Sequence, residues 1–255
     1  MGTTDDVGKS IGPGPGAVNR PALRRWLAGL HWRLFPPTCL LCGARGQARR
    51  DLCAGCAADL LRNLTACPCC GQPQSTSLTL CGECQRQPPA FVRTVAPFLY
   101  QPPLDLLIRR LKFHAQLPAA RLLGGLLADV LAARTDDLPQ CLIPVPLHPA
   151  RLRERGFNQS LELARPVARR LDIPIAAAML RRTRLTTPQT GLALPKRQTN
   201  VRGAFAAGPV GDVRRAAILD DVVTTGATVR ELARVLRAAG VEEIEVWAVA
   251  RTAGK

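Results

Sequence analysis

The sequence predicts an α/β fold, with a parallel sheet flanked by helices and preceded by a small cysteine-rich domain. Three observations support this. Four Cys-x-x-Cys pairs are concentrated between residues 39 and 84, and apolar strand-like runs alternate with amphipathic helical patterns from residue 91 onward. A Thr/Gly loop after an acidic pair joins one such run to a helix. The chain has 255 residues and is 47% hydrophobic, enough to form a substantial core.

The N-terminal region has two predicted parts. Residues 1–20 are rich in Gly and Pro and lack apolar periodicity, so they predict a disordered tail. Residues 21–36 predict a short amphipathic helix, with Leu23, Trp26 and Leu27 on one side. The sequence shows no secretory signal and no apolar run long enough to span a membrane, so we expect a cytoplasmic protein with no membrane span.

The cysteine pairs predict a double zinc ribbon over residues 37–87, holding two structural zinc ions. Two pairs provide four thiolates, which complete a tetrahedral shell and leave no open position for water. An iron–sulfur cluster is the alternative, and the equal fourteen-residue spacing fits both sequential and cross-braced pairing. Cys69 and Cys141 are interpreted as a spare thiol and a buried apolar side chain. The eight predicted ligands are Cys39, Cys42, Cys53, Cys56, Cys67, Cys70, Cys81 and Cys84.

The remainder of the chain, residues 90–255, predicts the α/β domain. Continuous apolar strands that alternate with helices indicate a parallel sheet with helices on its faces. A basic stretch with little periodicity, Arg181–Arg202, interrupts the pattern and contains six basic and no acidic residues. Strands are expected at 91–100, 141–147, 173–180, 214–221 and 243–250, and helices at 103–113, 117–134 and 158–172 and after residue 228, the last capped by Gly240.

The segment Ile218–Thr228, "ILDDVVTTGAT", predicts a site for a sugar phosphate. Paired carboxylates can accept hydrogen bonds from vicinal hydroxyls, and the following loop and helix N-terminus can bind an anion. Asp220 and Asp221 would point to opposite faces of a regular strand, so we expect the strand to end at or just before them. The alternative is a strand and a capped helix with two solvated aspartates. The phosphate-binding residues would be Thr224, Thr225, Gly226, Ala227 and Thr228.

Several motifs together resemble the ComF family. "AILDDVVTTGAT" resembles the phosphoribosyl-pyrophosphate motif of type I phosphoribosyltransferases. "IPVPLHPARLRERGFNQS", "LKFH", the basic stretch and the cysteine array narrow the resemblance to ComF proteins, which join a zinc ribbon to such a domain and take their name from DNA uptake during competence. The resemblance covers the chain from about residue 34 and implies a type I phosphoribosyltransferase-like parallel sheet.

The resemblance also implies roles for individual residues. Asp220 and Asp221 would contact ribose hydroxyls, and Mg²⁺ would be bound mainly by substrate oxygens and water. Each remaining candidate also has a structural interpretation, such as a turn end for His148, a solvated helix start for Arg151 or a surface position for Lys112. The pyrophosphate and flexible-loop candidates are His148, Arg151, Arg182, Gln189, Arg197, Asn200 and Lys112.

Two functions fit these motifs. The first is a protein that binds phosphoribosyl pyrophosphate or a ribose phosphate and is linked to DNA uptake. If it also catalyses transfer, it is a phosphoribosyltransferase. No residue in the sequence stands out as a nucleophile or a tuned base. The second is a non-catalytic accessory factor that uses the same fold to bind single-stranded DNA or a helicase partner. The formal charge of +16 suits an anionic partner, although an arginine-rich composition can also reflect coding bias.

Overall fold

The computed structural model describes residues 36–47, 50–76, 79–185 and 201–253. The predicted tail and nearly all of the predicted N-terminal helix lie outside these residues, as do Gln189, Arg197 and Asn200. No helix in the described part of the chain is both long enough and apolar enough to cross a lipid bilayer.

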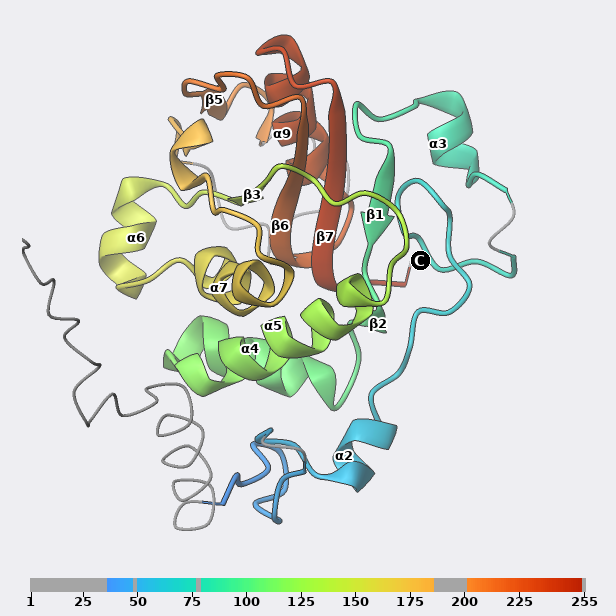
Figure 1. Cartoon of the computed structure of the whole chain (residues 1–255), viewed down its shortest axis with the longest axis vertical. Coiled ribbons are helices and arrows are strands. Elements are labelled where there is room, and N and C mark those ends of the chain that lie inside the picture. Colours follow the sequence, from blue (N-terminus) through green and yellow to red (C-terminus); the bar gives the residue numbers. More distant parts are fainter. Residues whose placement is uncertain (1–35, 48–49, 77–78, 186–200, 254–255) are drawn as a thin grey trace, which may run out of the picture.

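A parallel sheet forms the centre of the molecule, as the apolar runs predict (Figure 1). Its strand order is β1-β7-β6-β3, and β2 also pairs with β7. All of these pairings are parallel. The strands are β1 (Arg93–Val95), β2 (Phe98–Leu99), β3 (Cys141–Pro144), β6 (Arg215–Val223) and β7 (Glu243–Arg251).

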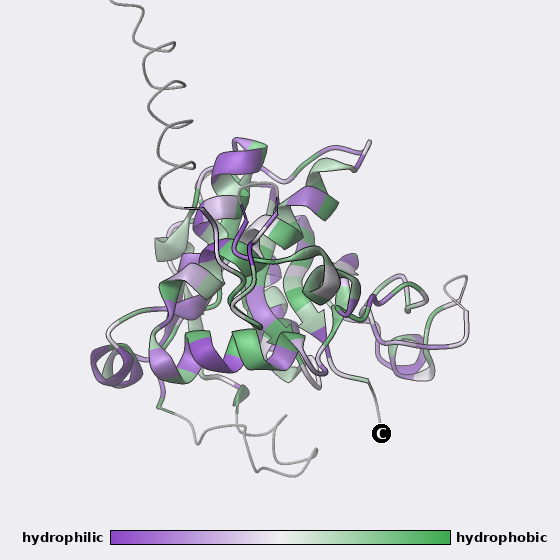
Figure 2. Ribbon diagram, turned by 90° about the horizontal axis from the view of Figure 1, so that it is seen from below, coloured by the Kyte–Doolittle hydropathy of each residue, from purple (hydrophilic) through white to green (hydrophobic). Residues whose placement is uncertain are grey.

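Helices cover both faces of this sheet. Helices α4, α5 and α7 lie on one face and share a core cluster with β7, and α9 packs against the other face (Figure 1). Figure 2 shows hydrophobic and hydrophilic residues interspersed along the helical ribbons. The helices are α4 (Leu104–His114), α5 (Leu117–Ala132), α6 (Pro149–Arg155), α7 (Gln159–Leu171) and α9 (Ala227–Ala238).

The cysteine-rich region contains only short helices among its described residues, α2 (Ala54–Ala58) and α3 (Gly82–Arg86). Neither is long enough to be stable through propensity alone. Few large apolar side chains are buried there, and Leu52 and Leu60 are the main ones. The region therefore depends on its cysteines and on contacts with the α/β domain.

Two strand predictions need correction, and one strand pair is additional. The strand expected at 173–180 is reduced to one bridge between Ile175 and Leu142, followed by a 3-10 turn at Ala177–Met179, because Pro174 lacks an N–H and alanines have low strand preference. The strand expected at 91–100 is split into β1 and β2 by Ala96 and Pro97. An antiparallel pair, β4 (Leu180–Arg182) and β5 (Phe205–Ala207), flanks the basic stretch and was not predicted.

The third correction concerns the acidic pair. We expected the strand to end at or before Asp220, but β6 continues through both aspartates to Val223. Its neighbour β7 supports this extension, with Asp220 opposite Ala248 and Val223 opposite Arg251. The neighbour on the other side, β3, ends at Pro144 opposite Leu219. The sheet therefore ends at the acids on one side only.

Candidate functional site

The acidic pair lies at the carboxyl end of the sheet, where parallel sheets bind ligands. Beyond Leu219, β6 has a strand partner on the β7 side only, since the last contact with the β3 segment is the Val145 N–H to Leu219 carbonyl bond at 2.9 Å. This one-sided extension gives Asp220 and Asp221 a defined backbone next to the point where β3 ends.

Three groups surround the carboxylates. The Asp221 side chain is buried and lies 2.5 Å from Nζ of Lys112, which α4 contributes. Asp220 accepts hydrogen bonds from Ser160 Oγ at 3.1 Å and from the backbone N–H of Asp221 at 2.9 Å. The solvated-aspartate alternative therefore does not describe this pair.

Burial and charge together raise the pKa values of both Asp220 and Lys112. Burial, reinforced by the neighbouring Asp221 carboxylate, raises the pKa of Asp220 to about 7. For Lys112, burial opposes the charged form, but Asp221 outweighs it and the pKa of Lys112 lies above its ordinary value. Near neutral pH the cluster can therefore hold or release a proton at Asp220 while Lys112 stays charged.

The predicted phosphate loop directly follows β6. Gly226 has a φ of 78° and is the N-cap of α9, and Thr225 Oγ1 accepts the N–H of Ala227 at 3.3 Å. A Cβ at Gly226 would meet only Arg230 Nε, at 4.0 Å, so glycine is needed there for its backbone conformation and not for space. The first turn of α9 then presents backbone N–H groups without intrahelical acceptors. We call residues Thr224–Thr228 the cradle.

Two predicted arginines, Arg182 and Arg151, lie on other elements. Burial and the charge of Arg151 both lower the pKa of Arg182, and the Asp220 carboxylate acts in the opposite direction, which places Arg182 within the electrostatic reach of both. Arg182 ends β4, and its guanidinium lies 5.3 Å from the ring centroid of Phe205. Arg151 lies on α6 and pairs with Glu154 at 3.2 Å.

His148 has a structural contact. Its Nδ1 accepts the N–H of Ala150 at 3.2 Å, so the imidazole caps the short helix α6. This contact matches the structural interpretation of His148 as the end of a turn. The structure thus brings together Asp220, Asp221 and Lys112, with Arg182 within electrostatic reach of Asp220 and Arg151 within reach of Arg182. Gln189, Arg197 and Asn200 lie outside the described residues.

Two residues of the predicted loop-helix junction have contacts that sequence reasoning did not assign. Asn158 caps α7 through the N–H of Ser160 at 3.0 Å, and its amide donates to the Val145 carbonyl at 3.0 Å. It thereby fixes the loop after β3 to α7 and holds Ser160 beside Asp220. From the sequence, the "GFNQS" motif indicates only the family resemblance. An Asn directly before a predicted helix is a common N-cap, and this is the signal that indicates the role.

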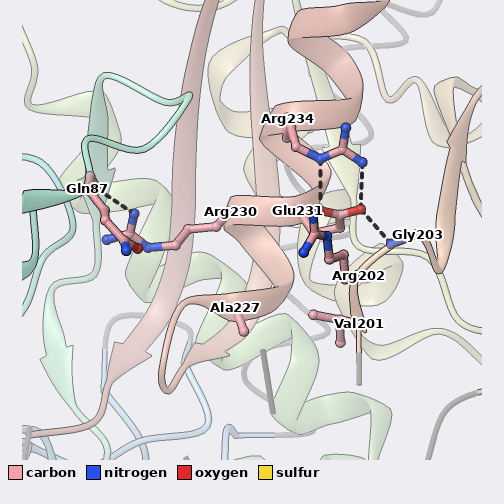
Figure 3. A pocket seen from close by; sticks show the side chains of 8 residues that line it. All are labelled: Gln87, Val201, Arg202, Gly203, Ala227, Arg230, Glu231 and Arg234. Carbon is pink, nitrogen blue, oxygen red and sulfur yellow. Dashed lines mark hydrogen bonds and ion pairs between the residues drawn. The ribbon is translucent and has the colours of Figure 1, made fainter. Parts of the chain in front are cut away.

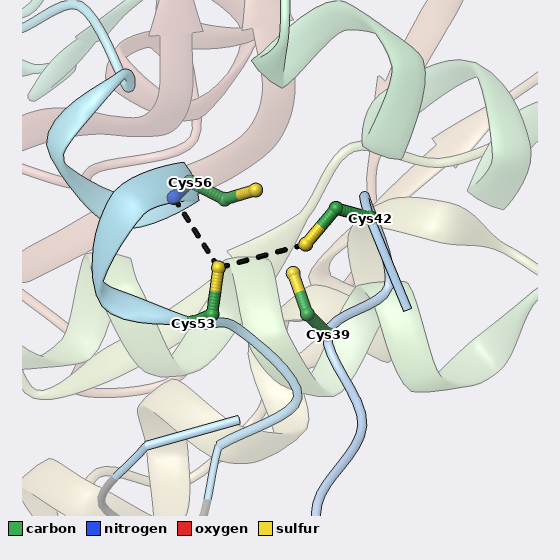
Figure 4. A group of neighbouring side chains, drawn as sticks. All are labelled: Cys39, Cys42, Cys53 and Cys56. Carbon is green, nitrogen blue, oxygen red and sulfur yellow. Dashed lines mark hydrogen bonds between the residues drawn. The ribbon is translucent and has the colours of Figure 1, made fainter. Parts of the chain in front are cut away.

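The cysteines form two separate quartets in sequential order, Cys39/Cys42/Cys53/Cys56 and Cys67/Cys70/Cys81/Cys84. Figure 4 shows the first, with its four sulfurs turned toward one another. Within each quartet all Sγ atoms lie within 4.8 Å of one another, which suits four thiolates around one tetrahedral ion. The second quartet is more buried than the first. The quartets support two structural zinc ions. Their pairing is sequential and not cross-braced, which decides between the two arrangements that the sequence left open.

Cys141 behaves as the sequence predicts. It begins β3, is buried, and contacts Met179 with 3.8 Å between the sulfur atoms. Burial raises its pKa to about 11, which disfavours a reactive thiolate.

A basic groove of about 580 Å³ lies beside the cradle (Figure 3). Its wall on α9 carries Arg230 and Arg234, and Arg202 contributes from the opposite segment. Glu231 lies between them and accepts the Gly203 N–H at 2.8 Å as well as Arg234 at 2.8 Å. The first two turns of α9 therefore hold the segment that follows the basic stretch.

The arrangement can bind a polar ligand with hydroxyls at one end and a phosphate at the other. Carboxylates are hydrogen-bond acceptors for hydroxyls, the helix N-terminus favours an anion, and guanidinium groups can neutralise a further anionic group.

Comparison with known proteins gives consistent matches. The double zinc ribbon domain family matches residues 30–85, and the phosphoribosyl transferase domain family matches residues 158–255. Competence protein F of Haemophilus influenzae is 36% identical over 221 residues, covering 84% of this chain and 96% of that protein. DNA utilization protein YhgH of Escherichia coli strain K12 is 37% identical over 222 residues, covering 85% and 98%.

Proposed function

Because the chain belongs to the competence protein F family, with a double zinc ribbon and a phosphoribosyltransferase domain, we propose that it binds phosphoribosyl pyrophosphate or a related ribose 5-phosphate. The observation that carries this proposal is the junction of β6 and α9. There the Asp220–Asp221 pair and the cradle are separated by only two residues, Val222 and Val223.

The ligand's two ends match the two halves of this junction. Asp220 and Asp221 would accept hydrogen bonds from the ribose 2- and 3-hydroxyls, and the cradle would bind the 5-phosphate through backbone N–H groups and threonine hydroxyls. Lys112 holds Asp221 in place and offsets its charge. Ser160, on α7, positions Asp220 by donating a hydrogen bond to its carboxylate.

The pyrophosphate group would face the basic side of the site. Arg182 and Arg151 are the described candidates, and Gln189, Arg197 and Asn200 are candidates in the basic stretch between β4 and β5. Mg²⁺ would neutralise pyrophosphate charge through substrate oxygens and water, with the acidic pair supplying nearby carboxylates. If transfer follows, these residues would stabilise charge on the leaving group, and the acceptor would supply the nucleophile.

Titration calorimetry of phosphoribosyl pyrophosphate with Mg²⁺ tests the binding proposal. Asp220→Asn and Asp221→Asn should each weaken binding by about tenfold or more, since each removes a charged acceptor. Asp212→Asn is the matched control, because Asp212 is exposed on a turn outside the site and the charge change is the same. Equal affinities for all four proteins would remove the basis for the assignment.

A second candidate function is contact with single-stranded DNA, and the basic groove favours it. Arg202 is exposed at its edge, next to Arg230 and Arg234 on α9, and the relatives are named for competence and DNA utilization. Phosphate contacts release counterions, so affinity for a short single strand should fall steeply with salt, and Arg202→Gln should reduce that slope by about one unit. A salt-independent affinity would exclude phosphate contact by these arginines.

A further inference from the structure

The two cysteine quartets are attached to different parts of the α/β domain. The first ribbon contacts the helices of one face, since the Leu40 carbonyl accepts a hydrogen bond from Arg110 on α4 and Arg50 pairs with Asp129 on α5. The second quartet belongs to the core cluster of the opposite face, with α9 and the strand residue Val223. Only the second quartet therefore has contacts that lead to the cradle in the described structure.

Arg251 is the first of these contacts. It is the last residue of β7, and its side chain is buried at 4% exposure. Its Nε donates to the Cys70 carbonyl at 3.2 Å, and its Nη1 donates to the Val223 carbonyl at 3.0 Å and also to the Thr224 carbonyl. One guanidinium thus joins a residue of the second quartet to the start of the cradle.

Arg230 is the second contact, at the far end of the cradle. Its backbone N–H closes the first turn of α9 on the Gly226 carbonyl at 2.9 Å. Its guanidinium donates to Cys84 Sγ at 3.7 Å and to the Gln87 carbonyl at 3.0 Å, the contact visible in Figure 3, and it pairs with Glu83 at 3.3 Å.

Taken together, the two arginines hold both ends of the cradle against one quartet. We propose that Arg251 and Arg230 are positioning residues that couple zinc occupancy of the second quartet to ligand affinity at the cradle, and that the first quartet is not coupled. This inference rests on the proposed function for the identity of the ligand. Thermodynamic linkage makes the coupling reciprocal, so a bound ribose phosphate must also tighten metal binding at the second quartet.

The ligand arm of the test compares matched cysteine variants in the zinc-loaded full chain. Cys84→Ala removes a ligand of the second quartet, and Cys42→Ala removes one of the first. Titration with phosphoribosyl pyrophosphate and Mg²⁺ should show affinity about tenfold weaker or more for Cys84→Ala and within about twofold of wild type for Cys42→Ala. Equal losses, or no loss, in the two variants would overturn the coupling while leaving wild-type binding, and with it the proposed function, intact.

The arginine variants test the route of the coupling. Arg230→Gln should weaken ligand binding and speed zinc release to a chromogenic chelator, and Arg251→Lys should retain more affinity than Arg251→Met because it keeps a charged donor. Arg50→Gln is the control, since it loosens the first ribbon at an exposed pair.

The reciprocal effect of ligand on metal is tested in Cys42→Ala, where ligand should slow zinc release from the remaining quartet by about fivefold or more. An unchanged release rate contradicts the proposal.

A ligand-free arm keeps the proposal testable if wild type binds no ribose phosphate. Amide hydrogen exchange over residues 223–228 should be faster in Cys84→Ala than in wild type and unchanged in Cys42→Ala. Equal exchange in both variants would overturn the coupling independently of any ligand. Absence of wild-type binding with faster exchange in Cys84→Ala alone would instead remove the proposed function and support the coupling.

Discussion

The central residues of the site are two adjacent carboxylates in different surroundings. Asp221 is buried against Lys112, and Asp220 is held by Ser160 and by the next backbone N–H. Like charges this close cannot both ionise freely, and burial adds to the effect. Burial and the neighbouring Asp221 carboxylate therefore raise the pKa of Asp220, while the charge of Lys112 acts in the opposite direction.

The raised pKa of Asp220 predicts a pH dependence of stability. This carboxyl titrates near 3.8 in the unfolded chain and near 7 in the folded one, so the folded state binds more protons between these values. Its contribution to the free energy of unfolding therefore falls as pH rises from about 4 to 7. Urea unfolding at pH 5, 6, 7 and 8 should show Asp220→Asn gaining stability relative to wild type across this window. A constant difference would contradict the assignment.

Lys112 provides a second prediction at this scale. Lys112→Met leaves the Asp221 carboxylate buried without its cation, although the lysine side chain is 25% exposed. We expect a loss of about 2 kcal/mol at pH 7, below the roughly 3–5 kcal/mol for a fully buried pair. Urea unfolding measures it, and the loss should shrink in the Asp221→Asn background. Additive effects of the two substitutions would show that the pair is not coupled.

Site residues were predictable from the sequence where their chemistry requires a fixed spacing along the chain. The Cys-x-x-Cys pairs and the acid–threonine segment follow from local sequence, since each pair lies within four residues and only two residues separate the acids from the threonine loop. Ser160, Arg230 and Arg251 were not predicted as site residues, because their contacts depend on which strands and helices become neighbours. His148 was predicted with both a functional and a structural reading, and its contact with Ala150 is structural.

At the scale of elements, the backbone of Gly226 predicts a weakened cradle on substitution. Gly226→Ala meets no steric obstacle, but its φ of 78° costs an alanine about 1–2 kcal/mol. We expect lower stability by that amount and weaker ribose-phosphate binding, measured by thermal unfolding and calorimetry.

Gly125→Ala in α5 is the matched control for the same chemical change. Its Cβ would enter open space in a helix interior, so it should stabilise the chain by about 0.5–1 kcal/mol and leave binding unchanged. If both substitutions had the same sign, the conformational explanation for Gly226 would be wrong.

Periodicity predicted the long elements well. The apolar runs that became β3, β6 and β7 and the amphipathic patterns of α4, α5, α7 and α9 match the structure, and Gly240 adopts the positive φ of 101° expected after a helix. The predictions failed where the length of a strand depends on the strands beside it. Ile175 is limited to a bridge on β3, and β6 continues through Asp221 because β7 runs beside it to Arg251. Local sequence does not reveal the length of a neighbouring strand.

At the scale of the whole molecule, the cysteine-rich region should depend on metal. It contains two quartets and short helices, so the wild-type chain should carry two zinc ions, and chelation should unfold residues 39–84 before the α/β domain. Metal analysis by mass spectrometry and hydrogen exchange after chelation check both statements. Protection of residues 39–84 that persists without metal would refute a structural role for zinc.

The central claim is that the β6–α9 junction binds the two ends of one ribose phosphate, and a crystal structure of the chain with phosphoribosyl pyrophosphate and Mg²⁺ tests it most directly. The account predicts the 5-phosphate at Thr224–Thr228, within hydrogen-bond distance of the first backbone N–H groups of α9. It also predicts the ribose hydroxyls at Asp220 and Asp221. A ligand bound elsewhere, or one with its pyrophosphate at the cradle and its ribose away from the acids, would contradict it.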